Sequence, residues 1–482
     1  MALPLPEVHC QDGTPVSPEY MLALCAVYGD MEKPSMDENV TKLVQPLDQK
    51  ELSGYVCALY EGWLGTGGEA KKRWVLYAFS FHGGRDVVPE LYKQIREWSE
   101  NSRGAMAAEA VQAMVLHGSQ EALLLVDQMS RKFKSRQVKN AAAAALEAAA
   151  DQLHISRAEL EDKLVPDLGF NRDMEQIFDY GPRTFTVRLN AALEAEVYDE
   201  SGKRLKNIPA PGKKDDPEKA AAANSDFKKM KRQLRSVVAS QKLRLEQALI
   251  SVRFWQAEKW EELFVRNPIM HLFATGLIWG VYENGTLKET FRYMEDGSFN
   301  TVDEEEFAFP GDGMIGLVHP LELKEELDAW KQQLSDYDVI QPFAQLERPV
   351  YEVNEEEKGS DSKAVTRFYG TEVNGWTLSS RLLAAGWMRG EILDAGYYME
   401  FYRSDGDAEA ELTFSGSSVG YEFEDVMIHE LHFYGHTETG EGASHQKMVQ
   451  IPLSQVSPRY FSEIVLQVAN VAETSGSEDK DV

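Results

Sequence analysis

The amino-acid sequence predicts an α+β protein, with a helical N-terminal region followed by a mixed α/β domain that contains an antiparallel C-terminal sheet. Residues 1–164 repeat helix-length apolar patterns separated by short Gly, Ser or Asn breaks. After Leu164 these patterns mix with segments of alternating apolar and polar residues, which is typical of half-buried strands. A chain of 482 residues also exceeds one ordinary domain, so we expect at least two.

The N-terminal region, residues 1–164, is expected to be a HEAT-like stack of short antiparallel helices. Its clearest pair, 105–116 and 121–133, is joined by a His-Gly-Ser turn, and the Ala-rich segment 140–150 follows. Small residues allow helices to approach closely, as they do in helical repeats. No strict sequence period is visible, so a plain helical bundle remains the alternative. The expected helices are 18–29, 49–64, 69–82, 87–99, 103–117, 119–133 and 136–152.

The C-terminal domain, residues 165–472, is expected to begin with short strands and one long helix. Alternation predicts strands at 184–189 and 194–198, the second of which leads into a polar turn. The linker that ends at Pro217 resembles a helix N-terminus, so a long helix should run from there to about Val252. A second helical piece is expected at 257–265.

Beyond residue 268 the sequence predicts helices and strands in alternation, which favours an α+β domain. The acidic, Ser- and Gly-containing tail, residues 473–482, is expected to be disordered. The expected helices are 268–277, 321–335, 377–385 and 457–471, and the expected strands are 278–282, 288–294, 314–318, 365–369, 396–404, 408–415, 419–424, 426–433 and 446–452.

Composition excludes several classes of protein. The chain has 79 acidic and 50 basic residues, a net charge of −29 that repels phosphate backbones, so broad nucleic-acid binding is not expected. Its three cysteines make neither a disulfide framework nor a metal motif. No segment reaches the roughly 18 consecutive apolar residues of a membrane span. We therefore expect a cytoplasmic protein that does not enter membranes.

Nine short motifs occur in a fixed order between about residues 165 and 470. They are VPDLG, DYGPR, PGKKDD, QKLRLE, WG, FRYMEDG, VHPLEL, DYDVIQPFAQL and GWMRG. Together they resemble the MolR-like (molybdate metabolism regulator) C-terminal domain family, a domain of unknown function. The resemblance implies a helical-repeat neighbour and no agreed chemistry. Asn267-Pro268 and Thr275-Gly276 depart from the family pattern of basic residues, and a WGR domain, which some relatives carry, is not expected.

The long helix holds the first candidate site residues. Gln241 lies within its apolar stripe, Arg244 lies at the margin, and Glu246 and Arg253 are offset by part of a turn. Polar groups that face a core must be paired, because unpaired burial costs several kcal/mol. These residues therefore form either a buried ion-pair network that locks the helix to the sheet or a pocket for an anion or amide.

Two further candidate sites lie where predicted strands end: one around Arg292 and one at His319. Arg292 could hold a carboxylate or phosphate, and Glu295 or Asp296 could act as a general base beside it. The alternative is a structural arginine next to a turn carboxylate. His319 follows the apolar segment 314–318, and strand ends often carry catalytic groups, although a helix-start histidine without a role is an equal interpretation.

The segment 336–346 fits neither an amphipathic helix nor an alternating strand. Tyr337, Gln341 and Gln345 surround a proline, and rigid polar loops with aromatic residues are often recognition elements. We include these three as candidate ligand contacts, with a purely structural corner as the alternative. A basic cluster on the long helix, Lys228 to Arg235, could bind phosphate or nucleic acid locally, but a solvated helix face is the favoured interpretation.

Two functional hypotheses follow. The first is a binding or regulatory protein, with a helical surface for a protein or peptide partner and a polar pocket for a small anionic ligand. The second is a metal-independent enzyme acting on a nucleotide-like or peptide substrate, with Glu246 or Glu295 as base and His319 as acid. No metal site is expected, and no cofactor is identified. Convergence of the candidate residues on one accessible pocket would favour the enzyme.

Overall fold

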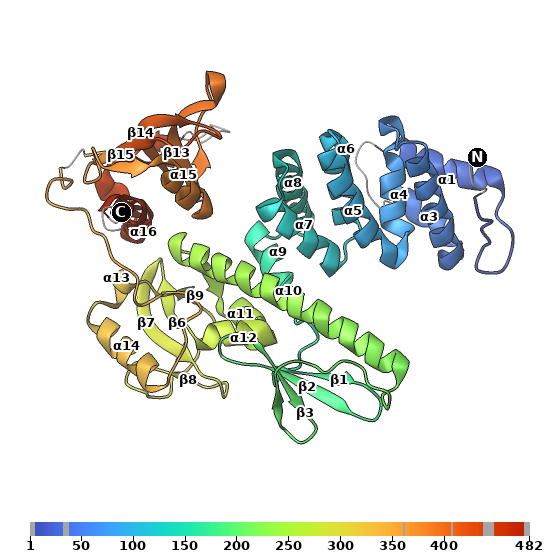
Figure 1. Cartoon of the computed structure of the whole chain (residues 1–482), viewed down its shortest axis with the longest axis horizontal. Coiled ribbons are helices and arrows are strands. Elements are labelled where there is room, and N and C mark those ends of the chain that lie inside the picture. The colour runs from blue at the N-terminus through green and yellow to red at the C-terminus, as the bar shows by residue number, and fades with distance from the viewer. Residues whose placement is uncertain (1–4, 32–37, 360–361, 406–407, 437–447, 477–482) are drawn as a thin grey trace. The chain divides into compact units, whose positions relative to one another are not determined.

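The chain divides into two compact units, Met1–Pro166 and Asp167–Val482. The computed structural model describes residues 5–31, 38–359, 362–405, 408–436 and 448–476. The first unit is helical, and the second combines helices with antiparallel sheets, so the predicted α+β class is confirmed (Figure 1).

Capping side chains begin many helices of the first unit, because Ser or Asp at the N-cap satisfies a backbone N–H that the helix leaves unpaired. Ser17, Asp48, Ser119 and Ser135 cap in this way, and Ser156 forms a full capping box with Glu159. The helices are α1 (Pro18–Gly29), α2 (Glu38–Val44), α3 (Gln49–Gly65), α4 (Trp74–His82), α5 (Val87–Glu100), α6 (Gly104–Leu116), α7 (Gln120–Lys132), α8 (Arg136–Gln152) and α9 (Arg157–Lys163).

Neighbouring helices of this unit pack pairwise. α5 contacts α6, α7 contacts α8, and α6 also contacts both α4 and α8. Buried alanines such as Ala110 on α6 and Ala142 on α8 permit this close approach. The nearest-neighbour pattern is typical of a helical stack, and its assignment as HEAT-like stays a prediction. The two seven-residue helices, α2 and α9, are too short to show an apolar period and were not expected from the sequence.

The second unit begins with a four-stranded antiparallel meander whose strands pair in chain order. Its strands are β1 (Glu175–Asp179), β2 (Thr184–Leu189), β3 (Ala195–Asp199) and β4 (Arg204–Leu205). The 34-residue helix α10 (Pro217–Ile250) packs on β1, where the ring of Phe227 meets Phe178 edge to face at 5.5 Å. α10 ends two residues earlier than predicted, because Val252 adopts a left-handed conformation with φ of 56°.

A five-stranded antiparallel sheet follows, in the order β5-β9-β6-β7-β8. One face carries an aromatic cluster that includes Trp260, Trp279 and Phe291, and the other is covered by α14 through Trp330 and Leu334. The elements are β5 (Phe254–Gln256), α11 (Ala257–Trp260), α12 (Pro268–Thr275), β6 (Ile278–Glu283), β7 (Thr286–Tyr293), β8 (Phe299–Asn300), β9 (Met314–Leu317), α13 (Pro320–Leu323) and α14 (Leu327–Asp336).

The last sheet has seven strands. Its main order is β10-β15-β14-β13-β12, and β11 and β16 also pair with β15. α16 packs against this sheet, with Phe461 5.7 Å from Phe433 between ring centroids. The elements are β10 (Ala364–Val365), β11 (Glu372–Asn374), α15 (Gly375–Ala384), β12 (Met388–Arg389), β13 (Tyr397–Asp405), β14 (Ala408–Ser418), β15 (Asp425–His436), β16 (Met448–Gln450) and α16 (Pro458–Ala472).

Several element predictions were wrong. The predicted strand 419–424 is the turn that joins β14 to β15, and most of the predicted strand 365–369 is also a turn. The predicted helix 321–335 is two helices, because Lys324 has a φ of 45° and breaks the backbone hydrogen bonding. The predicted disordered tail begins as a short 3-10 helix, Glu473–Gly476, and its last residues, together with 446–447 of a predicted strand, lie outside the described residues.

Candidate functional site

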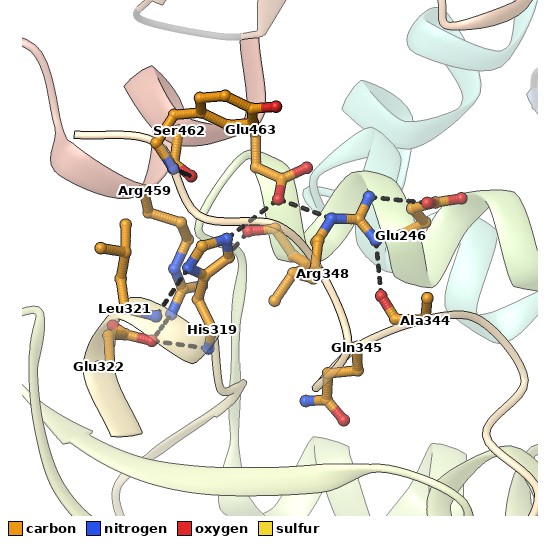
Figure 2. A network of polar contacts seen from close by, with 12 residues as sticks. Glu246, His319, Leu321, Glu322, Ala344, Gln345, Arg348, Arg459, Ser462 and Glu463 are labelled. Carbon is orange, nitrogen blue, oxygen red and sulfur yellow. Dashed lines mark hydrogen bonds and ion pairs between the residues drawn. The ribbon is translucent and has the colours of Figure 1, made fainter. Parts of the chain in front are cut away.

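A network of charged side chains joins four segments of the second unit (Figure 2). α10 contributes one carboxylate, α13 and its N-cap contribute a histidine and a carboxylate, and α16 contributes an arginine and a carboxylate. A further arginine comes from the segment that follows α14. We call this set the buried network: Glu246, His319, Glu322, Arg348, Arg459 and Glu463.

Arg348 is the centre of one branch. Its Nε donates to Glu463 Oε1 at 2.6 Å, and its Nη2 donates to Glu246 Oε1 at 2.7 Å. A third hydrogen bond runs from its Nη1 to the carbonyl of Ala344 at 2.9 Å. One guanidinium therefore holds α10, α16 and the 344–348 segment together, which uses the planar, multidentate geometry that distinguishes arginine from lysine.

His319 connects this branch to the start of α13. As the N-cap residue, it receives a hydrogen bond on Nδ1 from the backbone N–H of Leu321 at 3.2 Å. Because Nδ1 accepts, the ring proton lies on Nε2, which donates to Glu463 Oε1 at 3.0 Å. The predicted strand-end histidine is thus a helix cap with its ring fixed at both nitrogens.

Burial and charge act in opposite directions on Glu463. Burial favours the neutral acid, but the hydrogen bond from His319 and the positive charge of Arg348 outweigh it and lower the pKa of Glu463. The carboxylate is therefore ionised at neutral pH. Its second oxygen, Oε2, is buried without a hydrogen-bond partner among the described residues.

The second branch joins α13 to Arg459 in the first turn of α16. Arg459 pairs with Glu322, and its Nη2 also donates to the hydroxyl of Tyr282 at 2.9 Å. That hydroxyl donates to Glu322 Oε2 at 2.9 Å, and burial raises the pKa of Tyr282. Glu322 closes the capping box by accepting the backbone N–H of His319 at 2.9 Å, which links the two branches.

Access decides what the buried network can do chemically. The side chains of His319 and Glu463 are both 0% exposed, so neither can meet a substrate in this conformation. Arg348 and Arg459 are also buried. A proton held between these groups would stay inside the protein, and the arrangement acts as a cross-link between helices.

Sequence reasoning missed four members of the network: Glu322, Arg348, Arg459 and Glu463. A signal existed for two of them. Arg459 and Glu463 lie one helical turn apart in α16, whose other buried residues are nearly all apolar. Two ionisable groups on the core face of one helix need partners, and the partners lie far away in sequence.

The candidates on α10 do not join one pocket. Gln241 accepts a hydrogen bond from Arg244 Nη1 at 2.7 Å, and both side chains are buried. Arg253 lies after the helix, with its guanidinium 4.7 Å from the ring centroid of Trp255. Glu246 reaches the buried network through Arg348.

Arg292 occupies a separate position in the five-stranded sheet. It is fully buried, its Nη2 lies 3.4 Å from the exposed Glu295, and its guanidinium lies 5.1 Å from the ring centroid of Tyr337. Its Nε and Nη1 have no hydrogen-bond partner among the described residues. Burial lowers the pKa of Arg292, with Glu295 opposing the shift. Asp296 instead accepts from Ser298 in a surface turn.

The two glutamines of the 336–346 segment bind the backbone. Gln345 accepts from the N–H of Ile278 at 2.9 Å and donates to the carbonyls of Ile278 at 2.7 Å and Val318 at 2.9 Å. Gln341 donates to Gln345 at 3.2 Å and to the carbonyl of Gly276 at 3.3 Å. Both side chains bind backbone groups at or near the ends of β6 and β9.

The structure therefore brings together two of the predicted catalytic residues, Glu246 and His319, and separates them from Glu295. Within the parts of the chain that the structure describes, no group of three His, Cys, Asp or Glu side chains is arranged to hold a metal ion. In the same residues, no helix combines the length and apolar character needed to cross a membrane.

Comparison with known proteins gives two matches. Residues 202–387, which include all of α10 and β6 to β9, match a family described as Domain of unknown function (DUF4132). The chain is also 31% identical over 383 residues to the Uncharacterized protein YehI of Escherichia coli (strain K12). That match covers 78% of this chain and 31% of the relative, so the chain spans about a third of the relative's length.

No solved structure matches the chain at a significant level. The finer resemblance to MolR-like domains stays a prediction. The chain is therefore similar to a domain of unknown function and to an uncharacterized protein.

Proposed function

We propose that the protein is a binding protein whose C-terminal sheet presents exposed aromatic residues to a segment of a protein partner. The observation that carries this proposal is a set of large apolar side chains, each between 43% and 78% exposed. Surface groups of this kind, when they gather, are typical of interaction sites. We call them the aromatic surface: Tyr369, Trp376, Tyr421, Phe423 and Met427.

Two hydrogen-bonded segments carry the aromatic surface. The first runs from the turn after β10 into α15, and the second is the β14–β15 turn with the start of β15. Asn374 donates to the carbonyl of Phe423 at 3.3 Å, and the N–H of Gly375 donates to Glu424 at 3.0 Å. The ring of Tyr369 lies 5.9 Å from that of His429 on β15. These contacts hold the two segments that carry the five side chains side by side.

The surrounding charge indicates the chemistry of the partner. Residues 364–430 contain twelve acidic and four basic side chains, and Glu424 and Asp425 follow Phe423 directly. A partner segment with apolar or aromatic anchors and flanking lysines or arginines would complement this surface, because opposite charges steer association while buried aromatics supply affinity.

The buried network supports the same proposal from the inside. It fixes α16, on which the seven-stranded sheet packs, to α10 and α13. A rigid platform limits the conformational entropy lost on binding. A regulatory role would be exerted through such a partner. Among the described residues, the candidate acid His319 is 0% exposed, and the candidate bases Glu246 and Glu295 pair with different arginines, so these contacts favour the binding role over the enzyme alternative.

Selection from a displayed library of random peptides against the full chain tests the proposal. We expect enrichment of peptides that combine aromatic or aliphatic anchors with Lys or Arg. Phe423→Ser and Tyr421→Ser should each weaken binding of an enriched peptide about tenfold or more, as measured by fluorescence polarisation, because each removes an exposed anchor contact.

Ile177→Ser is the matched control. Ile177 is also a large exposed apolar residue, 68% exposed, but it lies on β1 in the meander. Its substitution should leave peptide affinity unchanged. The proposal is wrong if no peptide is enriched, or if Phe423→Ser binds the enriched peptides as tightly as the unsubstituted chain.

A further inference from the structure

A basic stripe on α10 contrasts with the acidic character of the whole chain. Its four cations lie at positions i, i+3, i+4 and i+7, so they share one helix face over about 10 Å. With Asn207 and Phe227 they line a cavity of about 400 Å³. We call these four the basic stripe: Lys228, Lys231, Arg232 and Arg235.

The basic stripe stands out because its charges are not neutralised. Nearby cations in the same part of the unit are paired: Lys219 lies 2.9 Å from Asp179, and Arg183 lies 2.8 Å from Asp215. Among the described residues, no carboxylate forms an ion pair with any member of the basic stripe. Four like charges within two helical turns repel one another, and a bound anion would relieve that repulsion.

The sequence around the basic stripe is also positively charged. Residues 203–235 contain eleven basic and four acidic residues, whereas the whole chain has a net charge of −29. Because the rest of the surface repels anions, a local positive potential of this kind is a specific feature and does not follow from the composition. The sequence alone favours a solvated helix face for these cations. The cavity that they line argues against that interpretation.

The adjoining apolar face of α10 holds the stripe in place. Phe227, Met230 and Leu234 are buried, and the Phe227 ring packs edge to face on Phe178 of β1. Lys231 Nζ lies 5.8 Å from the centroid of the same Phe227 ring. The helix therefore cannot rotate without exposing its core residues, and the cations keep a fixed spacing along the cavity.

We infer that this cavity binds a small ligand that carries two or more phosphate groups. Arginine binds phosphate through two parallel hydrogen bonds and lysine binds it as a point charge, and the stripe offers both. A volume of about 400 Å³ suits a small molecule. A long nucleic acid would have to approach a surface that is acidic elsewhere, so the small ligand is favoured. The inference is independent of the aromatic surface.

Calorimetric titration of the full chain with pyrophosphate and with magnesium-free ATP tests the inference. We expect binding of both, weakened by added salt, because the contacts are ionic. The double substitution Lys231→Gln with Arg232→Gln should weaken binding about tenfold or more, since it removes the central half of the stripe. Lys242→Gln, an exposed cation further along α10 and outside the cavity, is the control and should bind normally.

Circular dichroism should show that the double variant keeps its helix content, because Arg232 is exposed and Lys231 is only partly covered. Three outcomes would overturn the inference. They are no binding of either probe at about 1 mM, an equal loss of binding in Lys242→Gln, and tighter binding of a single-stranded oligonucleotide than of ATP. The last result would replace the small ligand by a nucleic acid.

Discussion

At the residue scale, two buried arginines show that the effect of a buried charge on stability depends on its hydrogen-bond and ion-pair partners. Arg292 and Arg403 are both almost completely buried. Arg403 is fully engaged, with Asp405 at 2.6 Å, the carbonyl of Ala385 at 2.6 Å and Gln467 at 3.0 Å. Arg292 has one weak ion pair and a ring contact, and two of its nitrogens lack a partner among the described residues. Burial without partners destabilises the folded state.

Arg292→Met should therefore leave the free energy of unfolding unchanged or raise it by about 1–4 kcal/mol, because an apolar side chain of similar length needs no partners. Urea unfolding followed by tryptophan fluorescence measures the difference. Arg403→Met is the matched control and should destabilise by about 3–5 kcal/mol, since it leaves the buried carboxylate of Asp405 without its cation. An equal loss of unfolding free energy in the two variants would show that the partners of Arg403 do not make it more important for stability than Arg292.

At the scale of elements, the buried network explains why short α13 is ordered. A four-residue helix has almost no stability of its own, since nucleation fixes several residues for one hydrogen bond. His319 and Glu322 cap its N-terminus reciprocally, and each is tied in turn to α16. The same contacts position β9 and α14, which precede and follow α13.

Glu463→Gln should lower the free energy of unfolding at neutral pH by about 3–5 kcal/mol, because it leaves Arg348 without its buried counter-charge. Its pH dependence should also change. The pKa of Glu463 in the folded state lies below the ordinary value of 4.5, so its stabilisation is present above that pH and lost as the pH falls through the folded pKa.

Urea unfolding at a series of pH values measures both effects, and the variant should show a shallower loss of stability in acid. Glu262→Gln, which removes an exposed partner of Lys259, is the control and should change stability by less than about 1 kcal/mol. A Glu463→Gln variant as stable as the unsubstituted chain at every pH would contradict the role given to the network.

At the scale of the whole molecule, hydrophobic burial follows the division into two units. The buried clusters around Leu91 and around Leu52 lie within the first unit. Those around Leu412 and around Trp330 lie within the second. Charge is also partitioned, with the basic stripe and the acidic region around the aromatic surface in different parts of the second unit. Units with their own cores are expected to fold alone.

Residues 1–166 and 167–482, expressed separately, should each unfold cooperatively on heating, because each retains its complete hydrophobic clusters. Differential scanning calorimetry measures the transitions. Pyrophosphate should raise the midpoint of the second fragment alone, since it carries the basic stripe. A fragment that lacks a cooperative transition would show that its unit depends on the other.

Much of the fold was predictable because its causes are local. Caps such as Ser119 and Ser135, and the apolar periods between them, predict helices close to their observed bounds. The failures have local causes too: the 419–424 turn alternates like a strand but its aromatic side chains face solvent, and Lys324 breaks a helix within an apolar period. A short stretch of sequence does not show that 419–424 has no strand to pair with, or that Lys324 adopts a positive φ.

Local patterns in the chain are enough to predict the α+β class, most helices and the candidate polar residues His319 and Glu246. They do not predict that Glu246 is joined to His319 through Arg348, 102 positions after Glu246, and Glu463, 144 positions after His319. Only the tertiary structure decided this, and it also decided that four lysines and arginines of α10 line a cavity while Gln345 binds strand ends. The physical reason is that ion pairs and burial depend on groups distant in the chain, whereas helix caps and apolar periods are encoded within a few residues.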